Sequence, residues 1–194
     1  MRIRIRVWSH LFHPLQHGAV MQAIETVQQG DLVIKVYQDD DPSNPRTDYD
    51  NGTIILVKPN RYFSGDKDCD LETEEEVREL YQDDKVLCIL PLYAYIHGSV
   101  ALSTGPFGCR FDSGQAGWVV ITQSKSDLMG YEGFTQEQLE EAIKAEVKTF
   151  HEYLNGEVYG FQISKGEEIL EQCWGYIGDK EGCLEDAKSL AAQS

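Results

Sequence analysis

The side chains with the most evident chemistry lie in one short, glycine-punctuated stretch of the chain: Cys109, Asp112, Ser113 and Gln115. His97 precedes this stretch in a separate turn. A thiol becomes a nucleophile when a neighbouring base accepts its proton, and an imidazole oriented by a carboxylate serves this role. Gln115 or backbone amides of the stretch would then hold a developing oxyanion. The pattern therefore allows a thiol enzyme that uses Cys109 with His97 and Asp112.

The same stretch also has a purely structural interpretation, which we favour. The sequence Asp112-Ser113-Gly114 is typical of a turn whose side chains bond to their own backbone. Cys109 would then be a small buried hydrophobe. The chain contains no phosphate-binding loop, dinucleotide fingerprint, H-E-x-x-H or calcium-loop pattern. We therefore predict a protein without catalytic residues and keep the thiol enzyme as an alternative.

Metal-ligating patterns are weak. His10, His13 and His17 share one face of a helix only if Pro14 does not interrupt it, and no acid or cysteine lies near them. The chain has five cysteines, an odd number, and no C-x-x-C pair. This count indicates neither a disulfide framework nor a four-thiolate zinc site, and it favours a reducing compartment. We predict no metal and no cofactor.

The charge balance is the most unusual property of the sequence. Thirty-three acids against 17 bases give a net charge of −16. Such a field repels nucleic acid and anionic membranes and attracts basic surfaces. We therefore expect a basic protein surface as the partner, with no direct nucleic-acid and no membrane binding. The alternative explanation of the charge is solubility alone.

The acids are densest between residues 66 and 84, where a helix is predicted at 74–82. Carboxylates three or four residues apart on a helix lie roughly 5–6 Å from each other, which resembles the charge density of a nucleic-acid backbone. This row either binds a cationic protein or is a solvated face. The residues of the predicted partner-binding set are Asp66, Asp68, Asp70, Glu72, Glu74, Glu75, Glu76, Asp83 and Asp84.

Short strands in hairpin order with helices between them predict an α+β fold. We expect an antiparallel or mixed central sheet with helices packed mainly on one face. Residues 1–30 are predicted to be an N-terminal extension, with a strand at Arg2–Trp8 and a short helix from about His17 to Gln28. Residues 31–194 are predicted to form a single domain, because no repeat or low-complexity linker interrupts them.

Within that domain, capping boxes are expected at Thr73 with Glu76 and at Thr135 with Gln138, at the starts of two helices. The second of these helices shows the clearest apolar stripe, which ends at Leu154. Strands are predicted at 32–37, 53–58, 86–96, 99–103, 118–122, 157–164 and 169–177, a loop at 105–115, and a last helix at 184–192.

Several stretches resemble a family of small acidic proteins carried by bacteriophages and mobile elements. The Cys-x-x-Asp-Ser-Gly-Gln block that starts at Cys109 is the most specific of them. The others include Ile34-Lys35-Val36-Tyr37, Asp41-Pro42-Ser43-Asn44-Pro45-Arg46, Asp50-Asn51-Gly52-Thr53, Glu146-Val147 and Tyr153-Leu154-Asn155-Gly156. The family has no assigned activity, so the resemblance implies a genomic setting and not a reaction.

Together, charge and resemblance predict a phage or mobile-element accessory protein in the cytoplasm of a bacterial host. It would bind and inhibit a host defence protein that itself binds nucleic acid, such as a nuclease, through an acidic surface that mimics nucleic acid. Besides the thiol enzyme, one further alternative is a pocket protein that sequesters a nucleotide. Its stacking surfaces would be Trp118, Tyr159 and Trp174.

Overall fold

A computed structural model describes residues 22–109 and 111–193. The predicted strand at Arg2–Trp8, the first part of the predicted N-terminal helix and His10, His13 and His17 lie outside these residues. The chain divides into two compact units, where the sequence predicts a single domain over 31–194. In the described residues, unit 1 comprises 22–43 and 156–193, and unit 2 is the segment 44–155. The first crossing point lies in the polar, proline-containing stretch 39–45 and the second at Asn155-Gly156, so the sequence does mark both places as turns, although it does not show that a second unit lies between them.

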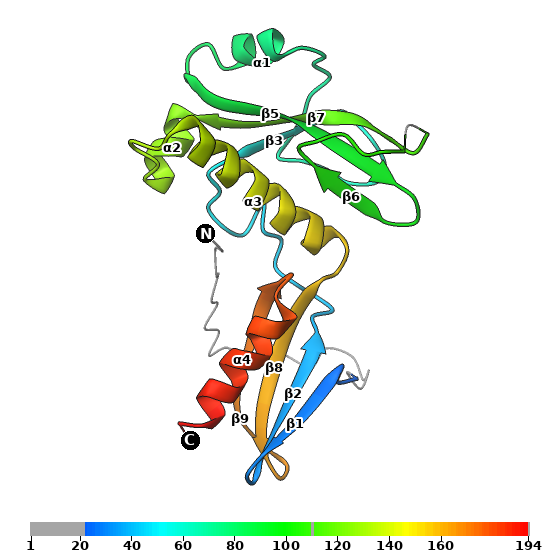
Figure 1. The fold of residues 1–194 in the computed structure, drawn as a ribbon, viewed down its shortest axis with the longest axis vertical. Helices are drawn as coiled ribbons and strands as arrows, with labels where there is room; N and C mark the ends of the chain where they lie inside the picture. The colour runs from blue at the N-terminus through cyan, green and yellow to red at the C-terminus, as the bar shows by residue number, and fades with distance from the viewer. Residues whose placement is uncertain (1–21, 110, 194) are drawn as a thin grey trace. The chain divides into compact units, whose positions relative to one another are not determined.

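Unit 1 is a four-stranded antiparallel sheet with one helix on one face (Figure 1). The small residues Cys183, Ala187 and Ala191 let the helix lie close to a sheet face that includes Ile34 and Phe161. The strands lie in the order β1-β2-β8-β9. The elements are β1 (Glu25–Gln29), β2 (Leu32–Gln38), β8 (Val158–Lys165), β9 (Glu168–Ile177) and α4 (Lys180–Ala191).

The first strand corrects the sequence prediction. Residues Glu25–Gln29 form β1, where a helix through Gln28 is predicted. Gly30, at a φ of 64°, turns the chain so that β1 pairs with β2 from Gln29 opposite Leu32. Thr26 and Val27 are β-branched, and pairing with a neighbouring strand outweighs a weak helical pattern.

Unit 2 is built on a five-stranded mixed sheet with strand order β4-β3-β7-β5-β6 (Figure 1). Only β3 and β4 run parallel to each other. The predicted α+β class and the antiparallel and mixed pairing are therefore confirmed. The elements are β3 (Ile54–Val57), β4 (Lys67–Asp68), α1 (Glu74–Leu80), β5 (Val86–Ile96), β6 (Val100–Ser103), β7 (Ser113–Thr122), α2 (Gln123–Met129) and α3 (Gln136–Leu154).

Helices cover both faces of the unit 2 sheet, whereas the sequence predicts helices mainly on one. The apolar stripe of α3, including Ile143 and Val147, packs on the face that contains Ile55 of β3. The adjacent residue Leu56 points to the opposite face, where Val77 of α1 covers it. Each helix thus buries one row of the alternating strand residues.

Both predicted capping boxes are present, at Thr73 with Glu76 and at Thr135 with Gln138. The predicted loop at 105–115 is wrong at its end, because β7 begins at Ser113 and pairs there with Tyr95 of β5. The sequence prediction also lacks α2, although a capping threonine and a glycine at positive φ mark its two ends.

Candidate functional site

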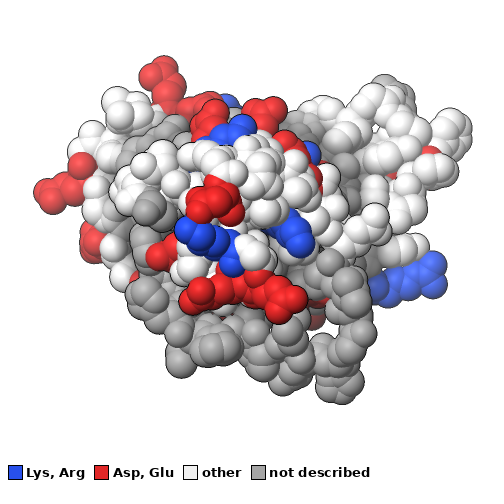
Figure 2. All heavy atoms as spheres, turned by 90° about the horizontal axis from the view of Figure 1, so that it is seen from below, with Lys and Arg blue, Asp and Glu red and all other residues white. Residues whose placement is uncertain are grey.

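Acidic and basic side chains of unit 1 are partly paired with each other. Lys165 forms an ion pair with Asp31, and Lys180 lies 2.8 Å from a carboxylate oxygen of Glu25. On the face shown in Figure 2, Asp and Glu side chains lie beside Lys and Arg side chains. This mixture does not form a field of one sign, so it is a poor candidate for a nucleic-acid-like surface.

The segment 66–84 of unit 2 is different. It contains ten acids and two bases, a net charge of −8, which is half of the net charge of the whole chain. The segment runs from β4 through α1 and ends before β5. The structure therefore gathers the predicted partner-binding residues on one short helix and its two flanking turns.

Three of the predicted residues have structural roles within unit 2. Asp66 pairs with Arg46 at 2.5 Å and also accepts a hydrogen bond from the backbone of Ile55. Glu76 closes the capping box of α1, and Asp84 accepts a hydrogen bond from the first turn of α2. These three carboxylates already accept hydrogen bonds that hold the start of the segment, the start of α1 and the start of α2 in place.

The pKa values agree with these structural roles. Backbone N–H groups of Thr73 and Glu72 donate to the Glu76 carboxylate and lower its pKa. Burial opposes ionisation of Asp84, but hydrogen bonds from Thr122 and Ser124 outweigh it and lower its pKa. Both groups stay ionised at neutral pH because the fold stabilises the charge.

Two further acids of the segment form ion pairs at the surface. Glu72 lies 2.7 Å from the ammonium of Lys58, and Glu74 lies 2.5 Å from Arg78, one helical turn away. Exposed pairs of this kind contribute little to stability and are readily exchanged for other partners.

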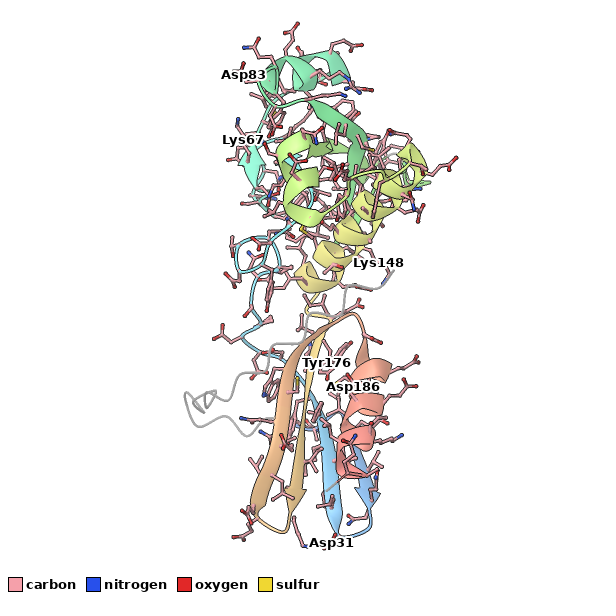
Figure 3. All side chains as sticks on the ribbon, turned by 90° about the vertical axis from the view of Figure 1, so that its left-hand side faces the viewer. Asp31, Lys67, Asp83, Lys148, Tyr176 and Asp186 are labelled. Carbon is pink, nitrogen blue, oxygen red and sulfur yellow. The ribbon has the colours of Figure 1, made fainter. Side chains whose placement is uncertain are left out.

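The remaining acids of the segment are exposed, and no base among the described residues pairs with them. Asp83 lies at the surface just beyond α1 (Figure 3). Glu79 also belongs to this group, although it is not in the predicted partner-binding set. Its position four residues after Glu75 on the helix is the signal that identifies it. We call this group the α1 carboxylates: Asp68, Asp70, Glu75, Glu79 and Asp83.

A buried ionic network joins the start of the acidic segment 66–84 to α3. The Arg46 side chain is 5% exposed and pairs with Asp66 and with Glu146 of α3, the latter at 2.7 Å and 7% exposed. Glu146 also accepts hydrogen bonds from the Gly52 amide at 2.8 Å and the Thr53 hydroxyl at 2.6 Å. Burial alone would lower the pKa of Arg46, but the two carboxylates raise it.

This network joins residues that are far apart in the sequence, and several belong to the stretches that carry the family resemblance. Arg46, Gly52, Thr53 and Glu146 all lie in those stretches. Their side-chain and backbone polar groups bond to one another inside unit 2, so the arrangement explains them as structural residues. Sequence reasoning missed this network, because nothing in the spacing of Arg46 and Glu146 indicates that they meet.

The three residues of the alternative thiol enzyme do come together, with Asp112 between Cys109 and His97. One oxygen of Asp112 lies 3.8 Å from both the Cys109 sulfur and Nδ1 of His97. The carboxylate is thus in the middle, and no hydrogen bond joins His97 to Cys109 among the described residues. The thiol enzyme requires His97 to accept the proton of Cys109, and the described residues show no contact between these two side chains.

The Cys109 loop instead resembles an anchored turn. The Ser113 hydroxyl donates to the carbonyl of Cys109, and the amide of Ile96 donates to the carbonyl of Asp112 at 2.9 Å. These bonds match the predicted turn in which side chains bond nearby backbone. Cys109 itself is half-buried, not fully buried as that interpretation expects.

The aromatic residues proposed as stacking surfaces are packed within their own units. Trp118 donates to the carbonyl of Leu71 at 3.2 Å in the core of unit 2. In unit 1, Tyr159 packs against the sheet core, and Trp174 lies over Gly160 with its ring 6.0 Å from that of Tyr37. Each of these three rings therefore has a packing role within its own unit.

Residues 22–109 and 111–193 contain no group of three His, Cys, Asp or Glu side chains that could hold a metal ion. No helix in this part of the chain is both long and apolar enough to cross a membrane. Comparison of the chain with protein-family models, curated proteins and solved structures gives no match.

Proposed function

We propose that this protein is a non-enzymatic binding module that uses the α1 carboxylates to bind a basic protein surface. One observation carries the proposal. In a segment of net charge −8, five carboxylates are exposed and pair with no base in residues 22–109 and 111–193, while neighbouring acids fix the backbone that presents them. Such preorganised charge favours fast, salt-sensitive association with a cationic partner.

More specifically, we propose that the partner is a host defence protein that binds nucleic acid. The α1 carboxylates would occupy the partner's Lys/Arg-lined groove and block it. The family resemblance supports the setting of a phage or mobile element in the cytoplasm of a bacterial host. The charge supports mimicry, because a row of carboxylates resembles phosphates to a basic groove. In this role the protein would compete with nucleic acid for one surface.

A charge-reversal experiment tests the proposal. The triple variant Asp70→Lys, Glu79→Lys and Asp83→Lys reverses three α1 carboxylates outside the first turn of the helix. The matched control variant Glu132→Lys, Glu167→Lys and Glu185→Lys makes the same change in net charge at exposed positions elsewhere.

Proteins retained from bacterial lysate by the wild-type chain are identified, and their affinities for both variants are measured at low and moderate salt. We expect the α1 variant to lose binding by about tenfold to a hundredfold at low salt, because several exposed pairs are each worth about 0.2–1 kcal/mol and repulsion replaces them. The control should bind like the wild type. Equal loss in both variants would show that only the net charge matters, and would refute a defined surface.

The thiol enzyme is tested separately. Cys109 lies in unit 2 near His97 and Asp112, so Cys109→Ala removes the only thiol of that group. We expect unchanged partner binding and an unchanged effect on the partner's activity. Loss of the effect with binding intact would favour catalysis over simple binding.

A further inference from the structure

The outer edge of β9 is the most open strand edge in the described part of the chain. β9 is ten residues long and forms the end of the unit 1 sheet, with β8 as its one described neighbour. The other edge strands, β1, β6 and β4, have five, four and two residues. A long edge strand offers unpaired backbone groups to an added strand, and short edge strands are a common protection against this.

The first half of β9 is also exposed at its side chains. The first four residues of β9, from Glu168 to Glu171, are all exposed. The side chains of Ile169 and Leu170 are 53% and 39% exposed. These two are among the few large apolar side chains of residues 22–109 and 111–193 that are exposed to water. Exposed apolar residues on an open strand edge are unusual, because they promote pairing with other chains.

The two faces of this half-strand differ in chemistry. Glu168 pairs in register with Lys165 and Glu171 with Ile163, so both acids point to the face covered by α4. Ile169 lies opposite Ser164 and points to the other face. The register shift between these pairs places Leu170 in a β-bulge.

The negative charge of this half-strand lies on the α4 side, where Glu168 and Glu171 point. A strand added at the edge would therefore meet carboxylates on one face and an apolar side chain on the other. Since successive residues of a strand point to opposite faces, the complementary partner has basic and apolar residues in alternation.

We propose that the outer edge of β9, at Glu168–Gln172, is a docking site for an extended segment of a partner protein that alternates Lys or Arg with β-branched residues. The added strand forms backbone hydrogen bonds with β9, its basic side chains face Glu168 and Glu171, and its apolar side chains cover Ile169. This is recognition by strand addition, in which the backbone gives affinity and the alternating side chains give specificity. The site lies in unit 1 and does not require the α1 carboxylates.

A synthetic peptide in which lysine and valine alternate tests this site on the full chain. Binding is measured by fluorescence anisotropy, and amide hydrogen exchange maps the contact. We expect slower exchange of the amides of β9 between Glu168 and Gln172, and no change in β1, which is the other edge of the same sheet. Control peptides have the same composition in separate lysine and valine blocks, or replace lysine with glutamate, and both should bind at least tenfold more weakly.

Variants then test the role of the acids. Glu168→Lys with Glu171→Lys should weaken binding of the alternating peptide by about fivefold to tenfold at low salt, whereas Glu181→Lys with Glu185→Lys on α4 should not. Equal binding of the block and alternating peptides would overturn strand addition, since only net charge would then matter. Absence of binding to the full chain, as expected if another segment of this chain or a second copy occupies the edge, would also overturn the proposal.

Discussion

At the scale of single residues, Arg46 is the least replaceable side chain of unit 2. Its guanidinium has several donors in a fixed plane, so it can bond Asp66 and Glu146 at the same time while also reaching the carbonyl of Thr53 at 2.9 Å. Lysine, a single point of charge, cannot span both carboxylates. The loop before β3 is thereby joined to α3 and to the start of the acidic segment.

Replacing Arg46 with methionine should lower the free energy of unfolding of unit 2 by about 3–5 kcal/mol, because two carboxylates lose the charge that balances them in the interior. Urea unfolding followed by amide hydrogen exchange in β3 and α3 measures this loss. Arg61→Met, at an exposed position, is the matched control and should change stability by less than about 0.5 kcal/mol. A similar small change for Arg46→Met would show that the network adds nothing to stability.

Gly117 is the second residue whose type is fixed by its surroundings. A Cβ at this position in β7 would lie 1.9 Å from the carbonyl oxygen of Leu56 in β3. The side chain would have to push two strands of the central sheet apart. Gly114, near the start of the same strand, has no heavy atom within 4 Å of the corresponding point.

We therefore expect Gly117→Ala to destabilise unit 2 by at least about 1–3 kcal/mol, the usual cost of overpacking a core. Gly114→Ala should be close to neutral. Thermal unfolding of the two variants, measured side by side, distinguishes them. Equal midpoints would mean that β3 and β7 are less closely packed than the structure shows.

At the scale of elements, α1 is short, and its stability depends on its caps more than on its seven residues. Isolated helices of this length are unstable in water, so the capping box and the packing of Val77 must hold it in place. The α1 carboxylates are useful to a partner only while this helix is formed. The cap is therefore indirectly part of the proposed binding surface.

The lowered pKa of Glu76 predicts how α1 responds to acid. A carboxylate whose pKa is lower in the folded state adds stability above its unfolded pKa, near 4.5, and loses it as the pH falls through the folded value. Amide exchange of α1 should accelerate below about pH 4.5 relative to that of α3. Glu76→Gln keeps an acceptor but cannot titrate, so the variant should lose this pH dependence. If the variant keeps it, another group is responsible.

At the scale of the whole molecule, one unit is inserted into the other. Every core cluster draws its residues from a single unit: two from unit 2 and one from unit 1. The two crossings of the chain lie close together in unit 1, because Gln38 donates to the carbonyl of Gly156 at 2.7 Å and Asp39 donates to that of Val158 at 2.8 Å.

Each unit should therefore fold without the other. We expect residues 44–155 expressed alone to unfold cooperatively and to show the same protected amides in β5, β7 and α3 as the full chain. Unit 1 should fold when Ser43 is joined to Gly156 by a short glycine-serine linker. A fragment of unit 2 that ends before α3 is the negative control. If residues 44–155 alone are as unprotected as that control, the two units depend on each other.

The sequence predicts local helices, caps and hairpins well, but it does not predict contacts between residues that are far apart in the chain. The α3 stripe, both capping boxes and the β8–β9 hairpin follow from spacing within a few residues, and all of them are present. The network of Arg46 and Glu146 and the insertion of unit 2 depend on contacts across about a hundred residues, which periodicity cannot reveal. The density of acids at 66–84 is visible in the sequence, but which carboxylates are already bonded is not.

The insertion has a consequence for synthesis on the ribosome. Unit 2 is one continuous stretch, so all of its strands and helices are available before the chain reaches Gly156. Among the described elements, the hairpin of β1 and β2 precedes unit 2 in the chain, whereas its sheet neighbour β8 and its covering helix α4 follow unit 2. Until these two elements are translated, the apolar face of the hairpin, which includes Ile34 and Val36, is exposed to water or bound by a chaperone. Slow or truncated translation would prolong this exposure and promote aggregation.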